Sequence, residues 1–216
     1  MKAILATIGS ATCLAAALVL TTSTAQAQNL LVDPGFESGV FAQPNPIPLP
    51  GGAGGGWGAW GASIATPTAH SGNYSALMWD NSWNPQGLYQ ILPATPGETF
   101  DLYAYYMASN PGVSGYGTPV LVQISFFASD GTTGLGAFGN WQPLGAANTW
   151  VQSPDVVATA PAGTAYVGAY LMMMDNNGGN GLNVYMDDAQ LTLVPEPSAL
   201  ALLGLGLTGG LIWRRR

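Results

Sequence analysis

Apolar and polar side chains alternate along several short runs in the middle and later parts of the chain. A period of two places successive side chains on opposite faces of a strand, so each run predicts a half-buried β-strand. Outside the two chain ends, no segment shows the sustained 3.6-residue period of an amphipathic helix. The predicted strands cover Tyr74–Met78, Thr99–Tyr105, Val120–Phe126, Ala165–Leu171 and Val184–Leu193.

Turn-forming residues separate these runs. They are Pro96-Gly97, Asp130-Gly131, Pro161-Ala162-Gly163 and Asn176-Asn177-Gly178-Gly179. Short strands at such spacing predict an all-β fold, an antiparallel β-sandwich, over residues 28–194. The Pro- and Gly-rich segment 43–56 is interpreted as a long surface loop of this domain. It is not taken as a linker, because the roughly 15 residues before it are too few for a domain.

The N-terminal end has the parts of a secretory signal peptide. Lys2 is followed by an apolar stretch from Ala3 to Leu20, and Ala25-Gln26-Ala27 closes the segment. This order predicts a signal helix over residues 1–27, cut by signal peptidase after Ala27. A lasting membrane anchor is the alternative. Cleavage removes Cys13, the only cysteine, and the processed chain then has no thiol or disulfide chemistry.

The C-terminal end carries a second apolar segment, Ala199–Trp213, followed by Arg214-Arg215-Arg216. These fifteen residues are short for a spanning helix, which needs about 20, and four glycines interrupt them. Three arginines hold that end on the cytoplasmic side of a membrane. We therefore expect a transient inner-membrane insertion of a precursor, in keeping with a processing signal.

Pro195-Glu196-Pro197, the short apolar helix and the terminal arginines occur in this order at the end of the chain. Residues 195–216 thus resemble the PEP-CTERM sorting signal of Gram-negative bacteria. The resemblance implies recognition by an exosortase, cleavage near Pro-Glu-Pro, and delivery to the cell surface or extracellular matrix. An ordinary tail anchor, the alternative, would not explain the Pro-Glu-Pro motif.

Charge narrows the possible partners. No Lys or Arg occurs between Ala3 and Trp213. Of the eleven acidic residues only Glu196 lies outside residues 28–194, which leaves ten there and a formal charge of −10. Nucleic acid is excluded as a partner because its binding depends on Lys and Arg, and anionic lipid surfaces are disfavoured. Neutral sugars, divalent cations, and basic or neutral partners remain.

Five short motifs follow one another along residues 28–194. They are Asn29–Gly39, Trp57 or Trp60, Ala69–Leu77, Leu88-Tyr89-Gln90 with Pro96–Phe100, and Tyr185–Leu191. Their order is similar to that of the carbohydrate-binding jelly rolls of the galactose-binding-like superfamily. The resemblance implies a jelly-roll β-sandwich and a polysaccharide ligand.

The same resemblance implies a structural Ca²⁺ held by Glu37, Asp187 and the backbone near Ser71. The residues agree with this expectation. Alternation from Tyr185 places Asp187 on the inward face with Ala189 and Leu191, and Asp188 outward. A buried carboxylate without a basic partner must protonate or bind a metal, and oxygen ligands suit Ca²⁺. The alternative is an Asp187 that accepts hydrogen bonds from backbone N–H groups and binds no metal.

Aromatic residues are the candidate sugar ligands. Flat apolar rings stack on pyranose faces, and we select Trp57, Trp60, Trp79 and Trp83. Trp57, Trp60 and Trp83 stand among Gly, Asn and Pro, which favours loops. The alternative for each is burial in the sandwich with the indole N–H satisfied.

Catalysis finds little support in the sequence. His70, the only histidine, stands in a turn-like His-Ser-Gly, from which no Ser-His-Asp triad can be argued, and one histidine does not make a His-based metal site. No two carboxylates are placed together at a cleft as glycoside hydrolysis requires. The sequence therefore predicts an exported, non-catalytic protein that binds extracellular polysaccharide. The alternatives are a structural or adhesive matrix protein without sugar specificity and, last, a glycan hydrolase.

Overall fold

The computed structural model describes residues 28–41, 56–61, 63–80, 85–113, 119–174 and 181–195. Within these ranges no α-helix occurs, and no helix is long and apolar enough to cross a bilayer. One 3₁₀ turn, η2 (Pro111–Val113), accompanies eleven strands. The strands are β1 Gly58–Trp60, β2 Ser63–Thr66, β3 Ser75–Asp80, β4 Gln86–Pro93, β5 Thr99–Ala108, β6 Val120–Phe127, β7 Gly134–Gln142, β8 Val151–Gln152, β9 Val156–Thr159, β10 Tyr166–Met173 and β11 Leu182–Leu193.

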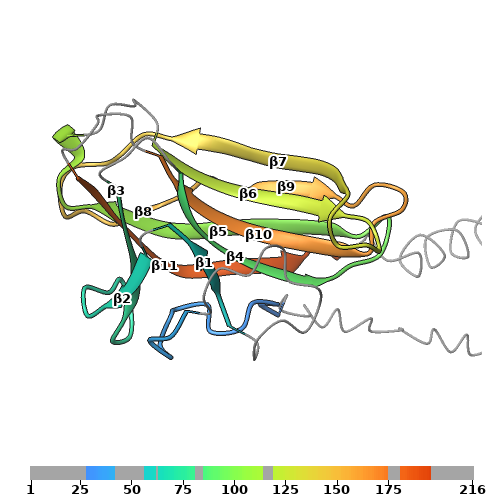
Figure 1. Ribbon diagram of the computed structural model, residues 1–216, viewed down its shortest axis with the longest axis horizontal. Coiled ribbons are helices and arrows are strands. Elements are labelled where there is room, and N and C mark those ends of the chain that lie inside the picture. Colours follow the sequence, from blue (N-terminus) through green and yellow to red (C-terminus); the bar gives the residue numbers. More distant parts are fainter. Residues whose placement is uncertain are drawn as a thin grey trace, which may run out of the picture.

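The strands form two antiparallel sheets that pack as a sandwich (Figure 1). Sheet A has five strands in the order β1-β4-β10-β6-β7. Sheet B has the order β2-β3-β11-β5-β8, and β9 also pairs with β5. The predicted all-β, antiparallel sandwich is confirmed.

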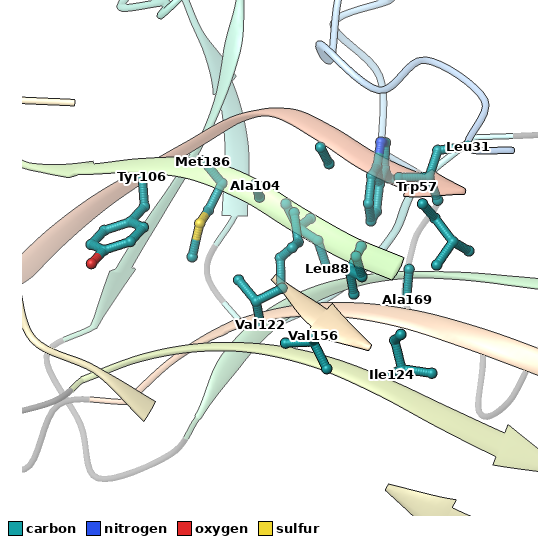
Figure 2. Close-up of a cluster of buried hydrophobic side chains, with 14 of the residues drawn as sticks. Leu31, Trp57, Leu88, Ala104, Tyr106, Val122, Ile124, Val156, Ala169 and Met186 are labelled. Carbon is teal, nitrogen blue, oxygen red and sulfur yellow. The ribbon is translucent and has the colours of Figure 1, made fainter. Parts of the chain in front are cut away.

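The core lies between the sheets and follows from the period of two. On β5, Phe100, Leu102 and Ala104 are buried, while the residues between them are half-buried. Leu88 of β4 and Ile124 of β6 meet this face from sheet A (Figure 2). Removing these side chains from water is the main force that holds the two layers together.

Each of the five predicted strands is found, in β3, β5, β6, β10 and β11. The turns at Pro96-Gly97, Asp130-Gly131 and Pro161–Gly163 also lie between strands as expected.

Six strands were not predicted. β4 lacks alternation because its first five residues are all buried, β7 is rich in glycine, and the other four have at most four residues. The predicted turn 176–179, the signal segment 1–27, most of the loop 43–56 and residues 196–216 lie outside the described residues.

A bulge changes the facing of β11 between Asp187 and Gln190. Before it, Val184 and Met186 point into the core. After it, Ala189 and Leu191 do. Asp188 has φ +43°, a left-handed conformation that interrupts the strand. The alternation expected from Tyr185 is therefore wrong. Tyr185 and Asp187 both lie on the outer side of sheet B, since Met186 between them is a core residue.

Candidate functional site

Asp187 is fully buried although it lies on the outer side of β11. The segment around His70 covers it. One carboxylate oxygen, Oδ2, accepts the backbone N–H groups of His70 at 2.7 Å and Ser71 at 3.2 Å. The other, Oδ1, accepts the N–H of Asp188 at 2.7 Å. Burial raises the pKa of Asp187 to about 6, and these backbone hydrogen bonds oppose the rise.

Glu37 binds the next residues of the same turn. Its Oε1 accepts the N–H groups of Asn73 at 2.9 Å and Tyr74 at 3.0 Å. The Asn73 side chain donates to Oε2 at 3.1 Å. The two backbone hydrogen bonds lower the pKa of Glu37. Gly72 is required at this point, because its φ is +64° and an added Cβ would lie 2.3 Å from Oε1.

Glu37, Asp187 and the turn at Ser71 therefore meet, as the resemblance implied. A Cβ built on Gly35 would lie 3.8 Å from Cγ of Glu37, 3.7 Å from Oδ1 of Asp187 and 3.5 Å from Oδ1 of Asp188, so the three side chains lie around the same point. The backbone hydrogen bonds of the metal-free alternative are also present. Within the described part of the chain, no three His, Cys, Asp or Glu side chains converge to hold a metal. A cation here would need backbone or water oxygens as well, which Ca²⁺ readily accepts.

His70 joins this turn to sheet B. Its Nδ1 lies 2.7 Å from Oδ2 of Asp188, and its ring stacks on Tyr105 with centroids 3.9 Å apart. Ser71 also donates its hydroxyl to Oδ1 of Asp188 at 2.8 Å. Sequence reasoning missed Asp188 as a partner of both residues. The bulge that turns Asp188 toward them has no sequence signal that we could identify.

Trp57 is a core residue, so the interpretation of it as a sugar ligand is wrong. The side chain is 0% exposed and lies in the hydrophobic core (Figure 2). It packs on Phe36, with ring centroids 5.1 Å apart. Its indole N–H donates to the carbonyl of Asp33 at 2.9 Å. Trp57 shares the inward side with Ala59, two residues later, so no ring face is left for a ligand.

Trp60 has the opposite orientation and lies half-buried on the outer face of sheet A. Its ring centroid is 5.8 Å from that of Tyr89 and 6.2 Å from that of Tyr170. Tyr89 and Tyr170 stack with centroids 5.9 Å apart. We call these three residues the aromatic group. Neither tyrosine is among the four aromatic residues selected from the sequence. They are neighbours only because β4 and β10 pair in the register that sets Tyr89 opposite Tyr170.

Glycines hold two of these rings close to the sheet. A Cβ on Gly87 would lie 2.1 Å from Cη2 of Trp60, and one on Gly58 would lie 2.5 Å from Cζ of Tyr89. Each ring thus occupies the space directly over a glycine of the neighbouring strand. Burial, helped by Tyr89, raises the pKa of Tyr170 to about 12, so its hydroxyl stays neutral.

The four selected tryptophans do not form one site. Trp79 lies on β3 of sheet B, half-buried and opposite Asn183. It therefore belongs to the other layer of the sandwich from Trp60. Trp83 lies outside the described residues.

Residues 193–216 match the family model described as the PEP-CTERM protein-sorting motif. The chain carries a PEP-CTERM sorting signal. This signal indicates a bacterial protein that is exported, processed by an exosortase and delivered to the cell surface or beyond. It begins where the sandwich ends, because β11 finishes at Leu193 and the N–H of Val194 still donates to Thr99 of β5.

No curated protein matches the chain. Among solved structures, TmCBM61 in complex with β-1,4-galactotriose is 18% identical, with TM-score 0.50, over 78% of this chain and 100% of its own. Arabinose-bound MgGH51 α-L-arabinofuranosidase is 14% identical, with TM-score 0.50, over 76% of this chain and 26% of its own. The CBM22-1 xylan-binding domain of Paenibacillus barcinonensis Xyn10C is 16% identical, with TM-score 0.44, over 75% of this chain and 92% of its own. At such identities the first two show a common fold and no more.

Proposed function

We propose that this exported protein binds neutral polysaccharide at the cell surface or in the extracellular matrix of a Gram-negative bacterium, without catalysis. The binding surface is the outer face of sheet A at the aromatic group. The observation that carries the proposal is the cluster of Trp60, Tyr89 and Tyr170, two of whose rings lie over glycines of the adjacent strand.

Trp60 and Tyr170 are half-buried, whereas Tyr89 keeps only 8% of its surface. The apolar faces on which the C–H face of a pyranose ring can stack are therefore those of Trp60 and Tyr170, with Tyr89 packed against both. Hydrogen-bonding groups lie beside them. Gln123 of β6 is the register partner of Tyr170, and its side-chain amide donates to the hydroxyl of Ser125 at 2.8 Å. The neutral Tyr170 hydroxyl and this amide supply donors and acceptors for sugar hydroxyls.

The charge of the domain favours a neutral ligand. Residues 28–194 contain ten carboxylates and no Lys or Arg, so anionic polymers are repelled at long range. The shared fold with TmCBM61, a protein solved with a galactotriose, supports a saccharide as the ligand class. The proposal includes no catalysis, because glycoside hydrolysis needs a pair of carboxylates at the site and no such pair is assigned to the aromatic group.

We also propose that Glu37 and Asp187, with backbone oxygens near Ser71, hold a structural Ca²⁺. Bound there, the ion would neutralise two carboxylates that have no basic partner. Its contribution is to stability, because it would tie the segment 33–38, the turn 70–74 and β11 together.

The test of function compares two matched tryptophan variants. Trp60→Ala removes a ring of the aromatic group, and Trp79→Ala removes a similarly half-buried ring on sheet B. We expect Trp60→Ala to weaken binding at least tenfold, about 1.4 kcal/mol, and Trp79→Ala to change it less than twofold. Affinity electrophoresis or calorimetry with galactan, xylan and the producing organism's exopolysaccharide measures this.

Three outcomes contradict the proposal. Equal losses in both variants would remove the site from sheet A. Absence of binding to any of these polymers would favour a structural or adhesive protein without sugar specificity. Release of reducing ends from a polymer would show a glycan hydrolase.

A further inference from the structure

Sheet A ends in one long exposed strand. Among the described strands at sheet edges, β1, β2, β8 and β9 have at most four residues, whereas β7 has nine. Among the residues that the structure describes, it pairs with β6 alone, and it forms the upper border of the sandwich in Figure 1. Residues 137–141 are all exposed, and Phe138 and Trp141 keep 43% and 41% of their surface.

β7 lacks the features that usually keep an edge strand from pairing with another chain. Such edges are short, or carry Lys, Pro or inward charges. β7 contains no charged residue and no proline. Its only irregularity is a register shift near Gly134, and residues 136–142 pair with 120–126 without a break. Seven residues of regular strand are therefore available.

The hydrogen bonds of β6 fix which groups of β7 are free. The carbonyl of Pro119 accepts the N–H of Met174 at 2.8 Å, so at this point β6 directs its backbone groups toward β10. Alternate residues of a strand bond to opposite neighbours. Val120, Val122 and Ile124 therefore bond to β7, at Gln142, Asn140 and Phe138. The N–H and C=O groups of Ala137, Gly139 and Trp141 are left pointing to the open edge.

We propose that two copies of the protein pair through β7, antiparallel, about a two-fold axis at Gly139. In this register Ala137 lies opposite the partner's Trp141, and Gly139 lies opposite the partner's Gly139. All three free residues then pair with free residues, which forms six inter-chain hydrogen bonds. The arrangement is isologous, so it closes at two copies.

Side-chain sizes fit this register. Each exposed Trp141 would pack beside an alanine and a glycine, which leave room for the indole. Gly139 cannot easily be anything larger, since an added Cβ would lie 2.6 Å from the carbonyl oxygen of Val122. An uncharged edge also allows two copies with ten carboxylates each to approach without placing like charges opposite one another.

Pairing joins two five-stranded sheets into one of ten strands with both outer faces on the same side. If the aromatic group binds saccharide, as proposed above, the dimer carries two sites on one surface and gains affinity for a polymer by multivalency. Only this consequence rests on the proposed function. The dimer itself is tested without any saccharide.

Sedimentation velocity of the exported, processed protein gives the first test. The wild type is expected to sediment with the mass of a dimer, and Ala137→Lys with half that mass. Ile64→Lys is the matched control, because it places the same charge at an exposed apolar residue on the edge strand β2, and it should leave the dimer intact. Thermal unfolding checks that all three proteins are folded.

The register is tested by crosslinking, since the processed chain has no cysteine of its own. Directly opposed residues lie about 5.5 Å apart between Cα atoms, within disulfide range. The double variant Ala137→Cys/Trp141→Cys should therefore form disulfide-linked dimers. Each single variant should not, because like positions lie about 14 Å apart.

A wild type that stays monomeric at high concentration overturns the proposal. So does a dimer that Ala137→Lys leaves intact. A dimer in which the double-cysteine variant fails to crosslink overturns pairing about Gly139.

Discussion

The buried carboxylate of Asp187 accepts the backbone N–H of His70 at 2.7 Å, across 117 residues of sequence. Glu37 does the same for Asn73 at 2.9 Å, across 36 residues. The turn between β2 and β3 is thus held by carboxylates from two other parts of the chain. A carboxylate suits this task because it offers several lone pairs to converging N–H donors and brings no donor of its own.

Removing the Asp187 carboxylate should destabilise the fold. In Asp187→Ala the N–H groups of His70 and Ser71 lose an acceptor that is buried away from water. Each unsatisfied group costs about 1–3 kcal/mol. We expect the free energy of unfolding to fall by about 2–4 kcal/mol, measured by urea titration. Asp155→Ala, which truncates an exposed carboxylate, should change it by less than about 0.5 kcal/mol. Similar values for both variants would show that the turn does not depend on Asp187.

Stability should also depend on pH through the raised pKa of Asp187. Between the ordinary value of 3.8 and about 6, the folded chain keeps a proton that the unfolded chain has lost. In the presence of a chelator, this carboxyl therefore makes the free energy of unfolding decrease as pH rises through that window. The slope is at most about 1.4 kcal/mol per pH unit, and it ends above pH 6.

Two other carboxyls act in the opposite direction at lower pH. Glu37 has a lowered pKa, so the stability it contributes is present above 4.5 and is lost as pH falls through its folded value. Asp130, whose pKa is lowered to about 2 by Thr133 and Thr132, behaves likewise between 3.8 and 2. Melting curves in EDTA should therefore show greatest stability between about pH 4 and 5. A steady rise from pH 4 to 7 would contradict the role of Asp187.

Calcium should reverse this slope. A metal site needs ionised carboxylates, so the cation stabilises most above pH 6 and little near pH 4. At a hundredfold excess over its dissociation constant, Ca²⁺ would add about 2.7 kcal/mol. Melting with Ca²⁺ and with EDTA at both pH values measures the effect. Glu37→Gln should abolish it and Asp155→Asn should not. An identical melting temperature with and without Ca²⁺ at pH 7 would exclude the ion.

Strands with one buried face could be predicted from the sequence. Runs such as Thr99–Tyr105 alternate between apolar and polar residues because one face of the strand is buried, so the alternation predicts the strand. The face of Asp187 could not be obtained by counting, because one bulge residue inverts every position after it and Asp188 looks like any other strand residue. The partners of Trp60 could not be obtained either, since Tyr89 and Tyr170 meet it through strand register. That Glu37, Asp187 and Ser71 gather at one place was predicted from a motif resemblance, not from periodicity.

Trp57 and Trp60 should respond differently to truncation, although only two residues separate them. Trp57→Ala empties a filled position in the core and should lower the free energy of unfolding by about 3–5 kcal/mol. Trp60→Ala removes a half-buried outer ring and should cost clearly less. Urea unfolding of both variants checks this order. If Trp60→Ala were the more damaging change, the assignment of Trp60 to an outer binding face would be wrong.

The fit between Trp60 and Gly87 gives a way to move the aromatic group without removing a ring. In Gly87→Ala the new methyl would fall 2.1 Å from Cη2 of Trp60, so the indole must rise from the sheet. β4 itself should tolerate alanine, because its backbone φ is not in the left-handed region that glycine favours. We expect Trp60 to become more solvent-exposed. With Trp79→Phe in both proteins, the fluorescence emission of the Gly87→Ala variant should then be red-shifted relative to that of the protein with Gly87. Polysaccharide binding should weaken severalfold while the chain stays folded. Ala137→Ser is a matched small change on the same outer face, away from Trp60, and should alter neither signal. Unchanged emission together with unchanged binding would mean that the position of this ring over Gly87 has no part in ligand recognition.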